Sequence, residues 1–224
     1  LYQRWEYADI AHAFMRLLFH ANPDGTRQME YYGSNSFWPT AMFFARPIPN
    51  HPSKVITVVG GHHDLPRQGQ LVILDPAKGT HETSGVVQRI PGFGKKVEPV
   101  ILDGLIGGSW PLFLHPYPLS EKYFLVSCKP TKTSLWGVYL VDVFDNFVLL
   151  YEEPGRAMLE PIALRKTPRQ PVIADTVQLD QKEASVFLMD VYFGPGLRGV
   201  PRGTVKSLRL INYEFTFHGF GGEP

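Results

Sequence analysis

The chain has 224 residues, of which 44% are hydrophobic and 19% are charged, and its formal net charge is +1. This composition allows a sizeable core and excludes an intrinsically disordered chain. The interspersed charges give no basic surface for nucleic acid or for an anionic membrane. No apolar run approaches the roughly 20 residues of a membrane span. We therefore expect neither a nucleic acid nor a membrane among the partners.

Turn-forming residues are frequent and scattered. The 21 glycines and 20 prolines lie between short apolar runs, and aromatic residues make up 13% of the chain. Short apolar runs separated by glycine and proline are typical of an all-β protein with many turns. The single cysteine, Cys128, excludes an intrachain disulfide.

Three segments predict a strand, a tight turn of Asp, Asn, Pro or Gly residues, and a second strand: 15–33, 69–90 and 135–153. Single strands are predicted at 41–48, 54–61 and 122–129. Residues 7–21 also have helical spacing, but we expect strand from about Met15. The turns are about 50 and then about 65 residues apart, near the length of a four-stranded propeller blade with insertions. Residues 1–155 are therefore predicted to form blades of an incomplete β-propeller.

A second region is expected after a proline-rich stretch at 152–177, because proline prevents a long regular element there. Two strands are predicted beyond it, at 184–193 and 204–217. Residues 156–224 are therefore expected to be the start of a second, small β domain.

The glycine loop between these two predicted strands contains the pattern G-x-G-x-x-G, formed by Gly194, Gly196 and Gly199. A dinucleotide fingerprint requires a helix that begins at the third glycine. Here Pro201 and Gly203 follow, and the next residues alternate like a strand. We therefore expect a turn-rich connection that binds no nucleotide.

Several segments resemble TolB-like β-propeller repeats, in the version found in large proteins related to the hydrazine synthase alpha subunit. They include "NPDGTRQMEYYGSNS", "ARPIPNHPSKVITVVGGHH" and "HPYPLSEKYFLVSCKP". The later segments "EPIALRKTPRQPVI" and "FLMDVYFGPGLRGVPRGTVKSLRL" resemble the start of that subunit's middle domain. The likeness covers nearly the whole chain. It implies a propeller followed by a truncated middle domain, in a periplasmic or secreted protein.

The resemblance also bears on cofactors and partners. The family's synthase condenses nitric oxide with an ammonium-level partner on c-type haems, which C-x-x-C-H motifs tether. The only cysteine here is followed by Lys129, so the chain cannot hold a haem covalently. We expect no cofactor within the chain and haem c in other parts of the parent protein. We expect the chain to be a piece of a longer polypeptide. The expected partners are therefore the other domains of that polypeptide and cytochrome c modules.

Candidate site residues are few. Cys128 with His62 or His63 could ligate a metal, although adjacent strand residues face opposite sides and recognisable ligand spacing is missing. A buried inert thiol and blade-edge histidines are the alternative. Tyr192 and Arg198 could face a porphyrin edge and its propionates, or could be ordinary turn and surface residues. No catalytic residue is nominated.

The sequence therefore favours a scaffold segment of a large periplasmic or secreted protein related to the hydrazine synthase alpha subunit, with any haem chemistry outside it. Two alternatives stay open. One is a carbohydrate- or protein-binding propeller without a redox role. The other is an enzyme fragment with a metal site built from Cys128 and a propeller histidine.

Overall fold

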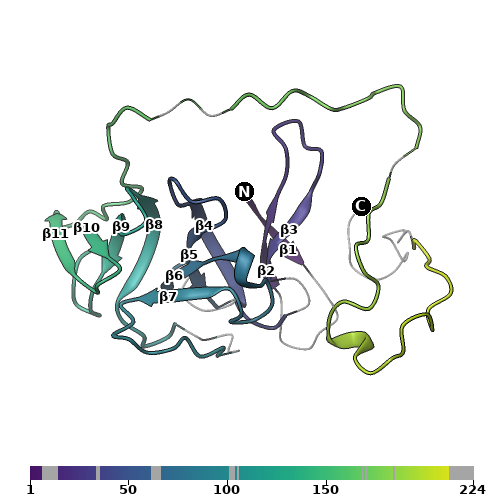
Figure 1. Cartoon of the computed structure of the whole chain (residues 1–224). Coiled ribbons are helices and arrows are strands. Elements are labelled where there is room, and N and C mark those ends of the chain that lie inside the picture. Colours follow the sequence, from purple (N-terminus) through teal and green to yellow (C-terminus); the bar gives the residue numbers. More distant parts are fainter. Residues whose placement is uncertain are drawn as a thin grey trace, which may run out of the picture. The chain divides into compact units, whose positions relative to one another are not determined.

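The computed structural model describes residues 1–6, 15–33, 36–61, 67–100, 104, 106–167, 169, 171–183 and 185–211 (Figure 1). The described residues form strands and loops, with two 3₁₀ helices of three residues each, η1 (Pro76–Lys78) and η2 (Pro195–Leu197). The all-β class is confirmed. The chain divides into two compact units, residues 1–177 and residues 178–224.

Seven strands form the first sheet. They are β1 (Tyr2–Glu6), β2 (Met15–His20), β3 (Met29–Tyr32), β4 (Ala41–Pro47), β5 (Val55–Gly60), β6 (Gln70–Leu74) and β7 (Val86–Ile90). Neighbouring strands pair antiparallel except β2 and β4, which one parallel pair joins, between Arg16 and Ala41. The sheet therefore consists of a three-stranded part, β1–β3, and a four-stranded meander, β4–β7.

The second sheet is a four-stranded antiparallel meander in chain order. Its strands are β8 (Leu112–Pro118), β9 (Tyr123–Lys129), β10 (Gly137–Asp142) and β11 (Phe147–Tyr151). All three predicted strand–turn–strand units are present, as β2–β3, β6–β7 and β10–β11, and the single strands predicted are β4, β5 and β9. Neither sheet closes on itself among the described strands.

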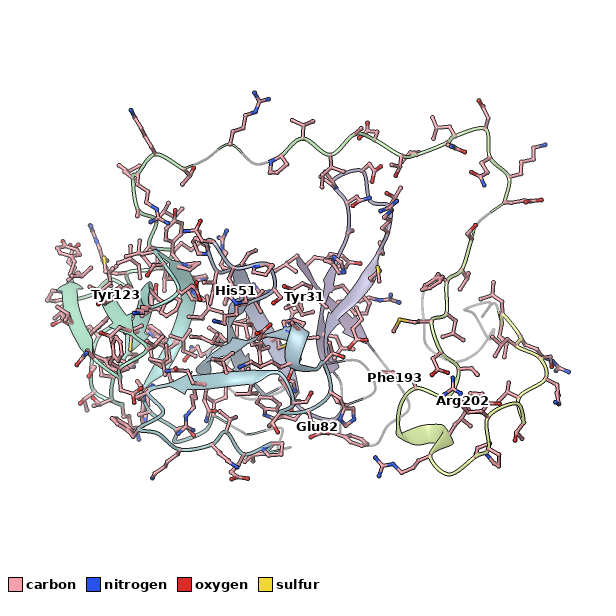
Figure 2. All side chains as sticks on the ribbon, in the orientation of Figure 1. Tyr31, His51, Glu82, Tyr123, Phe193 and Arg202 are labelled. Atoms are coloured by element: carbon pink, nitrogen blue, oxygen red, sulfur yellow. The ribbon has the colours of Figure 1, made fainter. Side chains whose placement is uncertain are left out.

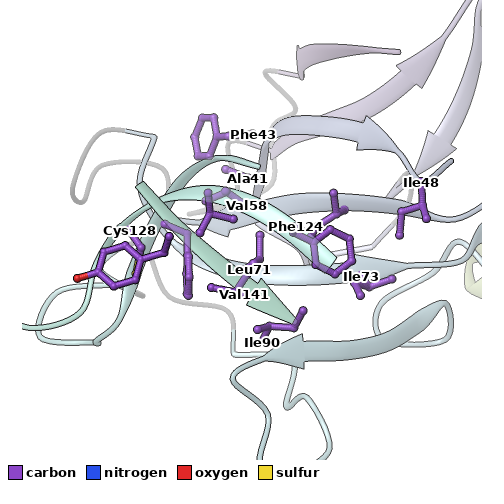
Figure 3. Packing of buried hydrophobic residues seen from close by; sticks show 14 residues of the cluster. Ala41, Phe43, Ile48, Val58, Leu71, Ile73, Ile90, Phe124, Cys128 and Val141 are labelled. Atoms are coloured by element: carbon purple, nitrogen blue, oxygen red, sulfur yellow. The ribbon is translucent and has the colours of Figure 1, made fainter. Parts of the chain in front are cut away.

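The two meanders pack face to face, and Figure 3 shows the side chains between them. The buried cluster draws on both sheets: Ala41, Phe43, Ile56, Val58, Leu71, Ile73 and Ile90 from the first, and Phe113, Phe124, Val126, Cys128, Tyr139 and Val141 from the second. On its other face, β4–β7 packs against Leu18, Tyr32 and Trp38. Because the β4–β7 meander is covered on both faces, its central strands are continuous apolar runs.

The two meanders also share three features at corresponding places. In the first strand of each, the register with the next strand shifts, between Phe43 and Arg46 in β4 and between Leu114 and Tyr117 in β8. Each first strand follows closely after a Trp-Pro dipeptide, and the third strand of each meander leads into a buried aspartate, Asp75 or Asp142. The chain thus contains an internal repeat of one four-stranded unit.

The expected strands of the second β region are not formed. Among residues 185–193 and 204–211 the structure has turns and irregular backbone, with η2 between them. The predictions of strands at 184–193 and 204–217 are therefore wrong for the described residues. The physical reason is that an alternating pattern becomes a strand only where a neighbouring strand accepts its backbone hydrogen bonds. Residues 7–14, for which helical spacing was noted, lie outside the described residues.

Candidate functional site

Cys128 lies in the core between the two meanders, where its side chain is fully buried (Figure 3). Burial raises the pKa of its thiol, because the apolar surroundings disfavour the thiolate. His62 and His63 lie outside the described residues. No group of three or more His, Cys, Asp or Glu side chains that could hold a metal occurs among the residues that the structure describes.

Tyr192 belongs to a small polar cluster in the second unit. Its hydroxyl oxygen accepts the backbone N–H of Val205 at 2.8 Å. The guanidinium of Arg202, labelled in Figure 2, lies 5.2 Å from the centre of the Tyr192 ring. The Asp190 carboxylate accepts hydrogen bonds from the Tyr192 N–H and from Arg202, both at 3.0 Å. Arg202 is thus the arginine that lies over the Tyr192 ring, whereas Arg198 is exposed.

The glycine loop does not have the form of a dinucleotide site. Gly194, Gly199 and Gly203 have positive φ angles of 106°, 84° and 88°, a conformation that glycine adopts without steric cost. The helix in this loop, η2, has three residues and precedes Gly199. A pyrophosphate site needs a longer helix that begins at the third glycine, and the described residues after Gly199 form none.

The most site-like feature of the described chain is a pocket beside the first strands of the two meanders. Its volume is about 450 Å³, within the range of small-molecule sites. The strands β4 and β8 form much of its wall, and residues of β1, of β2 and of segment 160–162 complete it. Its polar lining residues include Gln3, Arg46, His115 and Glu160.

His115 contacts residues on two sides of this pocket. Its ring centre is 4.2 Å from that of Phe44, with 55° between the two planes, and its Nε2 atom is 3.7 Å from Oε1 of Glu160. Its Nδ1 atom is buried without a hydrogen-bond partner. Burial lowers the pKa of His115, and the charge of Arg46 lowers it further, while Glu160 acts in the opposite direction. At neutral pH the imidazole is therefore uncharged.

The backbone around the pocket is strained at three positions. Phe44, His115 and Glu160 have φ angles of 53°, 46° and 53°, in the left-handed region that bulky residues avoid. Phe44 and His115 occupy equivalent bulges in the two meanders. Such bulges redirect side chains and occur preferentially near functional sites. The repeat thus brings together two rings that are far apart in the sequence.

A second cavity, of about 460 Å³, lies where β7 leads into β8. Trp110, Arg89 and Phe93 are among its lining residues. The Arg89 guanidinium donates to the carbonyl oxygen of Pro91, and the Lys129 ammonium lies 5.7 Å from the centre of the Trp110 ring. Two lining residues of this cavity, Arg89 and Trp110, thus already have partners within the protein, so we regard the first pocket as the better candidate site.

Sequence reasoning missed the first pocket. None of the predicted site residues, Cys128, Tyr192 and Arg198 among the described ones, lines it. The signal that could have indicated it is the repeated Trp-Pro dipeptide, at Trp38 and Trp110, since each precedes a bulged strand.

Comparisons with known proteins give no relative. No family model, no curated protein and no solved structure matches this chain. Among the described residues, no helix has the length and apolar character needed to cross a membrane.

Proposed function

We propose that the chain is a β-propeller scaffold segment of a larger periplasmic or secreted protein related to the hydrazine synthase alpha subunit. In this proposal, each four-stranded meander is one blade, and β1–β3 is part of a preceding blade. Any haem chemistry belongs to modules outside these residues, because a single cysteine cannot form a C-x-x-C-H motif.

The face-to-face packing of repeated meanders is the observation that carries the proposal. The β4–β7 meander is covered by β1–β3 residues on one face and by β8–β11 on the other. Propeller blades are four-stranded antiparallel units arranged around a central channel, so consecutive blades bury each other's faces in this way. The pocket beside β4 and β8 would then lie on the channel side, where the first strand of each blade is expected.

The outer face of β8–β11 supports a further blade in the parent protein. Val141 and Tyr139 of β10 face the core, so their neighbours Val138 and Leu140 face outward. Tyr151 pairs with Val138 and Val148 pairs with Leu140, which assigns both β11 residues to the outer face. Their exposed fractions are 55% for Tyr151 and 51% for Val148. An apolar sheet face of this kind is suited to burial against another sheet.

The proposal predicts that the isolated chain associates through this face. Size-exclusion chromatography with light scattering should show a mass that rises with concentration. The double variant Val148→Lys, Tyr151→Lys should be monomeric at the same concentrations and should keep its melting temperature, because both side chains are exposed. The matched control, Val172→Lys with Leu164→Lys, places the same charges on exposed residues of the extended segment and should associate like the unmodified chain.

Two results would contradict the proposal. One is an unmodified chain that stays monomeric at every concentration. The other is a control variant that dissociates as fully as the β11 variant, because association would then depend on total charge and not on this face.

A further inference from the structure

The pocket beside β4 and β8 combines apolar and charged walls. Leu18, Met42 and Phe44 give it an apolar side, and the first two of these are buried in the core. Arg46 and Glu160 give it two side chains of opposite charge. A concave site with an apolar wall and a few charged groups is the usual form of a small-molecule site.

The two charges are available to a ligand. Arg46 takes part in none of the ion pairs between described residues. Glu160 lies 3.7 Å from Nε2 of His115, which forms an ion pair with it only when the ring is protonated. Because burial and Arg46 lower the pKa of His115, its uncharged ring does not cancel the charge of Glu160 at neutral pH. The side chain of Glu160 is 75% exposed, so a solute can reach it. The pocket therefore offers one positive and one negative group that do not neutralise each other.

Two of the residues that line the pocket have a strained backbone. The positive φ angles of Phe44 and Glu160 are both 53°. Such conformations are costly for bulky residues, and they occur often at ligand-binding sites. Arg46 follows the β4 bulge, where its pairing with Ile56 restores the regular ladder.

We propose that this pocket binds a zwitterionic small molecule of the apolar α-amino acid class. Its carboxylate would meet Arg46, its ammonium would meet Glu160, and its side chain would lie against Phe44. A guanidinium is suited to a carboxylate, and an ammonium is attracted both by a carboxylate and by an aromatic face. The inference does not depend on propeller closure, because all the residues involved lie in the first unit.

Three probes of equal ring size test the proposal by calorimetry or by NMR titration: L-phenylalanine, 3-phenylpropanoate, which lacks the ammonium, and 2-phenylethylamine, which lacks the carboxylate. We expect saturable binding of L-phenylalanine and weaker binding of the other two. Arg46→Gln should weaken L-phenylalanine and 3-phenylpropanoate roughly fivefold each and should not weaken 2-phenylethylamine, which the arginine charge repels. Glu160→Gln should weaken L-phenylalanine and 2-phenylethylamine by a similar factor and should not weaken 3-phenylpropanoate, which the glutamate charge repels.

The matched controls are Arg156→Gln and Glu153→Gln, which alter an exposed ion pair outside the pocket and should leave all three affinities unchanged. The proposal is overturned if L-phenylalanine shows no saturable binding. It is also overturned if both single-function probes bind as tightly as L-phenylalanine, or if the pocket variants behave like the controls. These binding outcomes do not depend on whether the chain is monomeric or associated. A failure of the pocket proposal can therefore be told apart from a failure of the scaffold proposal.

Discussion

The β5 strand and the segment around residue 187 look similar in sequence and differ completely in structure. "VITVV" in β5 and "VFLM" at 186–189 are both short apolar runs. Val58 in β5 is fully buried, whereas Phe187 is 84% exposed. The difference shows that an apolar run becomes a strand only where at least one neighbouring strand pairs with it.

The two segments differ in whether a neighbouring strand pairs with them. β5 pairs with β4 on one side and with β6 on the other, so its backbone N–H and C=O groups are satisfied inside the protein. Residues 185–193 have no ladder, and the backbone turns at Asp190, where the Phe193 N–H donates to the Asp190 carbonyl oxygen. Without a ladder, the apolar side chains there have no sheet face on which to pack.

The largest expected effect on stability comes from replacing a phenylalanine in one region and comparing it with the same change in the other. Phe124 is fully buried between the meanders, so Phe124→Ala should lower the free energy of unfolding by about 3–5 kcal/mol. Phe187→Ala, the same change on an exposed side chain, should stay within about 0.5 kcal/mol. Urea unfolding followed by fluorescence measures both. Equal losses would mean that Phe187 is buried in solution and that the contrast between the regions is wrong.

Two glycines, one from each region, provide a second comparison of stability. A Cβ atom at Gly69 would overlap the carbonyl oxygen of Val59, and Gly69 also exchanges two backbone hydrogen bonds with Phe113. Gly69→Ala should therefore destabilise by about 1–3 kcal/mol. A Cβ at Gly196 meets no atom within 4 Å, so Gly196→Ala should change stability by less than about 0.5 kcal/mol. If thermal unfolding shows that Gly69→Ala is as stable as the unmodified chain, the close approach of Gly69 to the Val59 backbone is wrong.

The smallest effect concerns pH. The hydroxyl of Ser53 donates to the Asp75 carboxylate at 2.6 Å and is the main reason that the pKa of Asp75 lies below its usual value. A depressed folded-state pKa stabilises the protein above the unfolded-state pKa of about 3.9, and this stability is lost as the pH falls through the folded-state value. Ser53→Ala should therefore cost about 1–2 kcal/mol at pH 7, and this difference should shrink towards pH 3.

The matched carboxylate in the second unit is Asp190, whose pKa is lowered mainly by the Tyr192 N–H and also by Arg202. Asp190 belongs to the second unit, which contains none of the strands, so Arg202→Gln should leave the unfolding midpoint of the sheets unchanged at both pH values. Urea midpoints at pH 7 and pH 3 test both variants. A constant cost for Ser53→Ala at both pH values would show that the hydroxyl does not act through the charge of Asp75.

Local signals in the sequence were enough to predict most of the sheet structure. The turns at Asp75-Pro76 and Asp145-Asn146 were recognisable, because these residues form tight turns through their own side chains and backbone preferences. Strands β4, β5 and β9 followed from apolar runs bounded by such turns. The buried thiol of Cys128 also matched one of the two interpretations of its apolar strand.

Only the tertiary structure decided which apolar runs became strands and where the pocket lies. Residues 184–193 have the composition of a strand, yet the described part of that segment has no neighbouring strand to pair with. Phe44 and His115 meet because two bulges occupy equivalent places in two packed meanders, a relation between distant residues that local patterns do not contain. A turn depends on a few adjacent residues, whereas a ladder or a pocket wall depends on the surfaces that folding brings together.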